Sequence, residues 1–166
     1  EAITDSNFES IRYEGFGPYN IAVIVETLTD NKNRSASNLR TIFQKNGGNL
    51  GTQGSAIHYF QQIGIIKIEK NHEDEDKIYE YVIDSGAEDF IKSDEHYEIR
   101  CDKNKIYKVK KKLEENIDNF VSTEIEWLPV SKKDIDKNMK EDVIKFLEAL
   151  EDDEDVQNIF TNLNFI

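Results

Sequence analysis

The sequence is poor in cysteine, and its basic residues are far outnumbered by acidic ones. Cys101 is the single cysteine among 166 residues, which excludes an intrachain disulfide and a four-cysteine zinc site and favours a reducing compartment. No apolar run is long enough to cross a bilayer. Lysine and arginine number 21 against 34 acidic residues, so the formal net charge is −13. Because nucleic-acid phosphates repel a uniformly acidic surface, contact with DNA or RNA requires a local basic patch, a partner or a further segment.

The common catalytic motifs are also missing. No histidine lies in an HExxH motif and no serine in GxSxG, which removes the usual signatures of zinc and serine hydrolases. The segment GGNLGTQGS at residues 47–55 lacks the lysine of a P-loop. The acidic runs at 73–76 and 151–155 lack the glycine and spaced oxygens of a calcium loop, and we interpret them as solvated linkers with helix-end charges. We therefore expect no enzymatic activity, no cofactor and no metal site.

The hydrophobic pattern indicates a chain of alternating strands and helices. A β-branched run at 21–28 predicts a strand covered on both faces, after a glycine- and proline-rich turn at 13–18. Ser35 is the expected cap of the next helix, which Asn46 and Gly47 end. The other predicted elements are strands at 55–60 and 63–70, a helix at 77–85, a hairpin of 90–92 and 97–101, a helix at 103–115, a strand at 121–130, a helix at 139–150 and a strand at 156–162. This order favours an α+β fold of split β-α-β units.

One long stretch, residues 13–60, resembles a known family. It contains a YEGxGP turn, a VIVE strand, a TDNxNR loop, a KxGGNLG loop and a following GS. These elements resemble, in order and spacing, the signature region of the YebC family, which includes the PmpR proteins of some bacteria and the mitochondrial translational activator of cytochrome oxidase. The later segments EWLPVSKKDID and LEALEDDEDVQNIFTN also resemble family members. The resemblance therefore covers essentially the whole chain.

The resemblance implies two α/β-sandwich domains, one ferredoxin-like and inserted into the other. The expected bounds are 71–130 for the inserted domain and 1–70 plus 131–166 for the discontinuous one. Family members begin with a small lysine-rich helical domain, and this sequence starts close to where that domain would end. We therefore expect a fragment or a processed protein.

The resemblance also implies a non-enzymatic regulator of gene expression. One expectation is a probable DNA-binding transcriptional regulatory protein. The alternative is a ribosome-associated translation factor that assists difficult nascent sequences such as proline runs. The implied partners are DNA or ribosomal RNA, contacted mainly through the lysine-rich domain. The implied compartment is the bacterial cytoplasm or, alternatively, the mitochondrial matrix.

Two loops that flank the first predicted helix form the main candidate binding surface. They are residues 29–34 and 47–55, where glycine N–H groups can approach an anion and arginine can bind phosphate oxygens in pairs. The candidate residues are Asn31, Asn33, Arg34, Arg40, Lys45, Gly47, Gly48 and Asn49. Tight turns alone also explain these glycines, so both interpretations stay open.

A second basic patch lies in the segment KNKIYKVKKK at residues 103–112. Its candidate residues are Lys105, Lys108, Lys111 and Lys112. This patch is either a solvated helix surface or an additional phosphate contact, because like-signed patches add to the electrostatic attraction.

Overall fold

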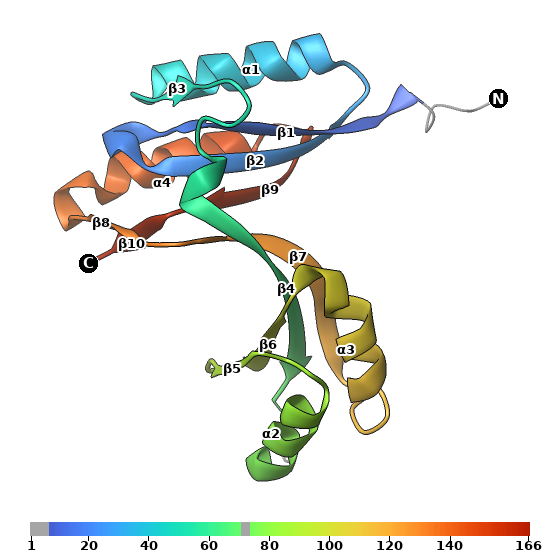
Figure 1. The fold of residues 1–166 in the computed structure, drawn as a ribbon. Coiled ribbons are helices and arrows are strands. Elements are labelled where there is room, and N and C mark those ends of the chain that lie inside the picture. Colours follow the sequence, from blue (N-terminus) through green and yellow to red (C-terminus); the bar gives the residue numbers. More distant parts are fainter. Residues whose placement is uncertain (1–6, 71–73) are drawn as a thin grey trace. The chain divides into compact units, whose positions relative to one another are not determined.

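The computed structural model describes residues 7–70 and 74–166, and the chain divides into two compact units (Figure 1). Unit 1 consists of Glu1–Gln61 and Leu128–Ile166, and unit 2 of Gln62–Trp127. The expected insertion began at residue 71, whereas unit 2 begins at residue 62. The difference arises because the strand that ends at Glu69 pairs with a strand of unit 2.

Unit 1 contains a four-stranded antiparallel sheet in the order β3-β1-β2-β9. Its strands are β1 (Glu9–Phe16), β2 (Ala22–Thr29), β3 (Asn49–Leu50) and β9 (Val156–Thr161). β2 is the predicted β-branched strand, and its first four residues are buried. The predicted turn at 13–18 is wrong at 13–16, because β1 continues to Phe16. The backbone of β3 passes so close to Gly15 that a side chain would not fit, since a Cβ atom there would lie 2.6 Å from the carbonyl oxygen of Asn49.

Two helices, α1 (Lys32–Lys45) and α4 (Lys137–Glu151), pack against this sheet. Their apolar side chains form one cluster with Val23 and Val25, which point to the same face of β2. At its centre, the rings of Phe43 and Phe146 meet edge to face with centroids 5.0 Å apart. Two short parallel strands, β8 (Lys133–Ile135) and β10 (Leu163–Phe165), complete the unit.

The start of α1 differs from the prediction. Asn31 is the N-cap, and its side chain accepts the backbone N–H of Arg34. Ser35 is instead buried within the first turns of the helix. The predicted cap is therefore wrong because an earlier asparagine meets the same requirement.

Unit 2 has the strand order β5-β6-β4-β7. Its elements are β4 (Phe60–Glu69), α2 (Glu75–Asp84), β5 (Asp89–Lys92), β6 (His96–Cys101), α3 (Ile106–Leu113) and β7 (Phe120–Pro129). This β-α-β-β-α-β order with the two strand pairs interleaved is the predicted ferredoxin-like arrangement, which is confirmed. The apolar sides of both helices contribute to its core, together with Cys101, which is buried as expected.

Two local predictions in this region need correction, and a third falls partly outside the described residues. Residues 57–59 form a 3-10 turn where a strand was expected, so a single strand, β4, replaces the two predicted ones. The helix predicted at 103–115 is a 3-10 turn at 103–105 followed by the shorter α3. The acidic run expected before α2 begins at Glu73, which lies outside the described residues.

A buried carboxylate fixes the loop that joins β3 to β4. The side chain of Glu14, on β1, is fully buried. It accepts backbone N–H groups of Gly54, Ala56 and Ile57 at 2.8 to 3.0 Å, and the guanidinium of Arg12 at 3.2 Å. Burial alone raises the pKa of this carboxyl, but the donors together lower the pKa below its ordinary value. Glu14 therefore holds this loop against the sheet as a charged anchor.

Replacing Glu14 tests this anchor. Glu14→Gln keeps the size of the side chain but removes its charge, so we expect the free energy of unfolding to fall by about 2–3 kcal/mol at neutral pH. Because the folded pKa is lowered, the stabilisation is present above the ordinary carboxyl pKa and is lost as pH falls through the folded value. Urea denaturation across pH should show wild type and variant converging in acid. Glu26→Gln, on neighbouring β2, is the control and should change stability little; equal effects of both variants would contradict the anchor.

Candidate functional site

Helix α1 carries positive charge on an acidic chain. Its charged residues are all basic: Lys32, Arg34, Arg40 and Lys45. All four are exposed, and the helix contains no acidic residue. Since the whole chain has a net charge of −13, α1 is a local site where a polyanion can approach.

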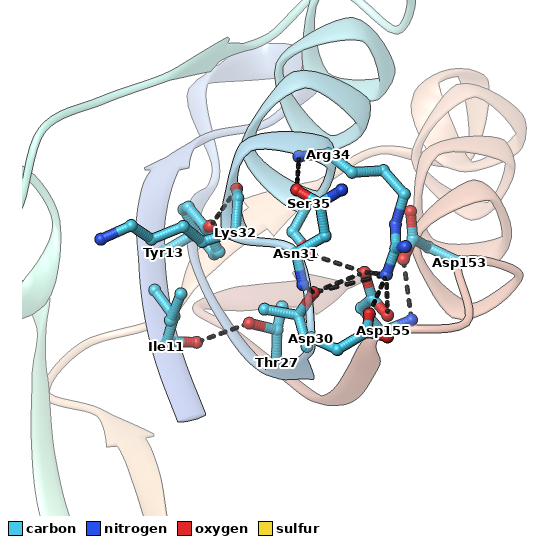
Figure 2. A network of polar contacts seen from close by, with 11 residues as sticks. Ile11, Tyr13, Thr27, Asp30, Asn31, Lys32, Arg34, Ser35, Asp153 and Asp155 are labelled. Atoms are coloured by element: carbon cyan, nitrogen blue, oxygen red, sulfur yellow. Dashed lines mark hydrogen bonds and ion pairs between the residues drawn. The ribbon is translucent and has the colours of Figure 1, made fainter. Parts of the chain in front are cut away.

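Arg34, however, is engaged within the fold (Figure 2). Its guanidinium lies 3.0 Å from Asp30 and 3.0 Å from Asp155. The carboxylate of Asp155, which is buried, also accepts the hydroxyls of Ser35 and Thr29. The prediction of Arg34 as a free phosphate ligand therefore conflicts with these pairs. The interpretation of 151–155 as only a solvated linker is wrong at Asp155, because this residue anchors the start of α1.

The charge of Asp155 is stabilised by this network. Burial raises the pKa of Asp155, but the hydroxyl of Ser35, the guanidinium of Arg34 and the hydroxyl of Thr29 lower it below its ordinary value. Hydrogen bonds to Asp155 and to Asp30 in turn raise the pKa of Arg34. Both groups therefore remain ionised at neutral pH and hold α1 to the segment before β9.

The glycines after α1 complete its C-terminal cap. The N–H of Gly47 donates to the carbonyl of Gln44 at 3.3 Å, and that of Gly48 to the carbonyl of Phe43 at 2.8 Å. Gly47 has a φ of 80°, the left-handed backbone typical of such caps. A Cβ atom at Gly48 would lie 2.3 Å from the carbonyl oxygen of Phe16. The two N–H groups are thus already bonded, and the turn interpretation accounts for both glycines.

The remaining predicted residues of this surface are side chains at the helix and its edges. Asn31 caps the helix, and Asn33, Arg40, Lys45 and Asn49 are exposed. Within the described residues, Arg40 and Lys45 make no ion pair. They are five positions apart, so they point about 140° from each other around the helix. The structure therefore does not bring them into one stripe.

Lys45 lies instead in a pocket of about 480 Å³ between the end of α1, the turn after β1, and α4. Its lining residues are Pro18, Tyr19, Lys45, Asn46, Gly47, Asp142 and Lys145. The hydroxyl of Tyr19 donates to Asp142, and this bond raises the pKa of Tyr19. We call this site the Tyr19 pocket. Tyr19 and Lys145 are not among the predicted residues, because they come from segments far apart in the chain.

A second pocket, of about 380 Å³, lies near the start of α1 and is acidic. It is lined by Arg34, Asn38 and residues 152–155. The two ends of α1 thus differ in charge: carboxylates surround its start, whereas two lysines flank its end. Of these two pockets, only the one at the end of α1 favours an anion.

A comparison with known proteins assigns the family. The family model described as "TACO1/YebC second and third domain" matches residues 8–163. This chain belongs to the TACO1/YebC family. Its resemblance to that family, seen in the sequence, is therefore confirmed.

The relatives of this YebC-family chain include bacterial proteins named as regulators. It is 57% identical to a probable transcriptional regulatory protein of Pelagibacter ubique, over 98% of this chain and 67% of the relative. It is 41% identical to one of Zymomonas mobilis, over 94% and 63%. A crystal structure of a conserved hypothetical protein from Aquifex aeolicus matches with a TM-score of 0.87 at 35% identity, over 96% and 66%. The chain thus spans about two thirds of the length of these relatives.

The second basic patch of the YebC-family chain lies in unit 2. Lys105, Lys108, Lys111 and Lys112 are all exposed, on α3 and the turn before it. Lys112 pairs with Glu115 at 3.3 Å. A shallow pocket of about 300 Å³ mixes three of these lysines with Asp84 and Glu115. The carboxylates weaken the patch as an anion site, so it stays a secondary prediction.

Other site classes receive no support from the described parts of this chain. Among residues 7–70 and 74–166, no group of histidine, cysteine and acidic side chains could hold a metal ion. No helix in the same ranges is long and apolar enough to cross a membrane.

The two carboxylates that pair with Arg34 provide a matched test of the α1 anchor. Asp155→Ala removes a buried acceptor of three side chains, so we expect the free energy of unfolding to fall by about 2–3 kcal/mol. Asp30→Ala removes a half-exposed partner of the same arginine and should change stability little. Chemical denaturation at neutral pH measures both. A larger loss for Asp30→Ala than for Asp155→Ala would show that burial does not decide the contribution.

Proposed function

We propose that this chain regulates gene expression without catalysing a reaction, and that it contacts nucleic-acid phosphates through the exposed basic residues of α1. One observation carries the proposal: all the charged residues on α1 are basic, whereas the chain as a whole is strongly acidic. The names of the Pelagibacter ubique and Zymomonas mobilis relatives support a regulatory role. DNA is accordingly the first target we propose.

The cations available for this contact are Lys32, Arg40 and Lys45. Within the described residues none of them is in an ion pair, in contrast to Arg34. Each phosphate that such a cation neutralises releases counterions, so binding weakens as salt rises. Because the rest of the surface repels phosphates, we expect weak, salt-sensitive binding by this chain. We infer that most of the nucleic-acid affinity of the whole protein comes from the lysine-rich domain that family members carry.

Ribosomal RNA offers the same phosphate chemistry as DNA, so the experiment must separate the two targets. Binding to duplex DNA is measured by fluorescence anisotropy, and binding to ribosomes by co-sedimentation, at matched salt. Sequence-specific DNA affinity supports a transcriptional role. Co-sedimentation with ribosomes in the absence of such affinity supports the translational alternative.

A charge reversal on α1 tests the surface itself. We expect Arg40→Glu with Lys45→Glu to weaken binding to the relevant target by about tenfold or more at low salt, because two phosphate contacts become repulsive. On duplex DNA the salt dependence should become weaker: the slope of log K against log salt, which is negative, should decrease in magnitude by about two. The matched control is Lys77→Glu with Lys132→Glu, two exposed lysines outside both candidate patches, which changes the net charge equally. Equal weakening by both double variants would mean that only the net charge matters and would contradict a surface on α1.

A further inference from the structure

The turn at the Tyr19 pocket has an unusual backbone. Tyr19 (φ 58°, ψ 24°) and Asn20 (φ 64°) are the two described non-glycine residues with a left-handed conformation, and they are adjacent. Asparagine tolerates this conformation, but it is costly for tyrosine because Cβ crowds the neighbouring backbone. A glycine would form the same turn without that cost. The geometry of the turn therefore does not explain a tyrosine at this position.

The surrounding structure holds Tyr19 in place. The N–H of Gly17 donates to the carbonyl of Ile21 at 2.8 Å, which closes the turn. Gly17 also packs closely on α4, since a Cβ atom there would lie 2.7 Å from the ring of Phe146. The hydroxyl of Tyr19 bonds to Asp142 of the same helix. These contacts keep the ring, which is 38% exposed, at the wall of the pocket instead of in the core. Strained residues that are held in this way concentrate at binding sites.

The chemistry of the pocket matches the parts of a nucleotide. Its volume of about 480 Å³ is suited to a small ligand. Lys45 and Lys145 provide ammonium groups for a phosphate, and the ring of Tyr19 provides a surface on which a base can stack. Asp142 provides an acceptor for an exocyclic amino group. Two cations against one carboxylate leave the site with a net positive charge.

We propose that the Tyr19 pocket binds one unpaired nucleotide of a nucleic-acid strand, with its base on Tyr19 and its phosphate between Lys45 and Lys145. An unpaired nucleotide is required because both faces of a base in a duplex are already stacked on neighbouring bases. This proposal rests on the proposed function. It adds that the nucleic acid bound near α1 is single-stranded at the pocket. The acidic pocket at the start of α1 directs the strand away from that end.

The test compares binding of this chain to labelled single-stranded oligonucleotides, of DNA and of RNA, with binding to the duplex of the same sequence at matched salt. Tyr19→Ala should weaken single-strand binding by about tenfold or more, because stacking is lost, and should leave duplex binding nearly unchanged. Tyr19→Phe retains the ring and should retain most of the single-strand affinity. Lys145→Met, outside α1, should weaken single-strand binding while leaving Tyr19 in place. Stronger binding of RNA than of DNA would identify the bound strand as RNA, and the reverse order would identify it as DNA.

Two controls separate this pocket from general effects. Tyr107→Ala removes a tyrosine that is 75% exposed on α3, and it should leave single-strand affinity unchanged. Asn20→Gly relaxes the neighbouring left-handed residue without removing the ring, so it should preserve both thermal stability and affinity.

The outcomes distinguish the pocket from the broader proposal. One outcome is that Lys145→Met and a folded Tyr19→Ala both keep wild-type single-strand affinity, while the Arg40 and Lys45 double variant loses it. In that case the pocket proposal is wrong, and the proposal that α1 binds phosphates is retained. If Tyr19→Ala does not fold, an unchanged affinity of Lys145→Met alone overturns the pocket. If the wild-type chain binds neither strands, duplex nor ribosomes at low salt, the proposed function fails as well.

Discussion

Unit 1 depends on a buried carboxylate that joins the two parts of its sequence. The hydrogen-bonding partners of Asp155 at Thr29, Arg34 and Ser35 are 120 or more positions away in the chain. Such a contact forms only after a long loop closes, which costs conformational entropy. Unit 2 consists of contiguous residues, and β4 and β7 are neighbours in its sheet. Folding of unit 2 therefore brings the two parts of unit 1 together and lowers the entropy cost of the Asp155 contact.

The same carboxylate determines which basic residues face solvent with their charge unpaired. Asp155 and Asp30 neutralise Arg34, so the positive charge of α1 remains on residues away from that pair. At the far end of the helix, Lys45 shares a pocket with Lys145, and the nearby Asp142 already accepts the hydroxyl of Tyr19. On this acidic chain the unpaired cations near α1 are therefore few: Lys32, Arg40 and Lys45 on the helix, and Lys145 on α4 beside its end. A small set of cations of this kind favours a few defined phosphate contacts over general attraction to polyanions.

Local patterns explain which elements could be predicted from the sequence. β2, the β5–β6 hairpin, β7, α4 and β9 follow directly from runs of apolar residues, and the resemblance supplied the ferredoxin-like arrangement of unit 2. β1 was missed because Gly15 was interpreted as a turn residue, whereas it makes room for β3. The Tyr19 pocket could not be predicted, because Tyr19 and Lys145 meet only through the packing of α4. For the same reason, the role of Asp155 could not be seen in a run of five acidic residues.

The glycine-rich loop at 47–55 shows why sequence alone does not reveal whether backbone N–H groups bind an anion of the protein itself or an anion of a ligand. Three N–H groups do converge on an anion, that of Gly54 in this loop and those of Ala56 and Ile57 just after it, but the anion is the carboxylate of Glu14. Its N–H groups at Gly47 and Gly48 are bonded to the end of α1. Because these backbone donors serve the fold, recognition of an external phosphate at this end of unit 1 must rely on side chains. The strained turn that holds Tyr19 beside two lysines is where the fold provides them.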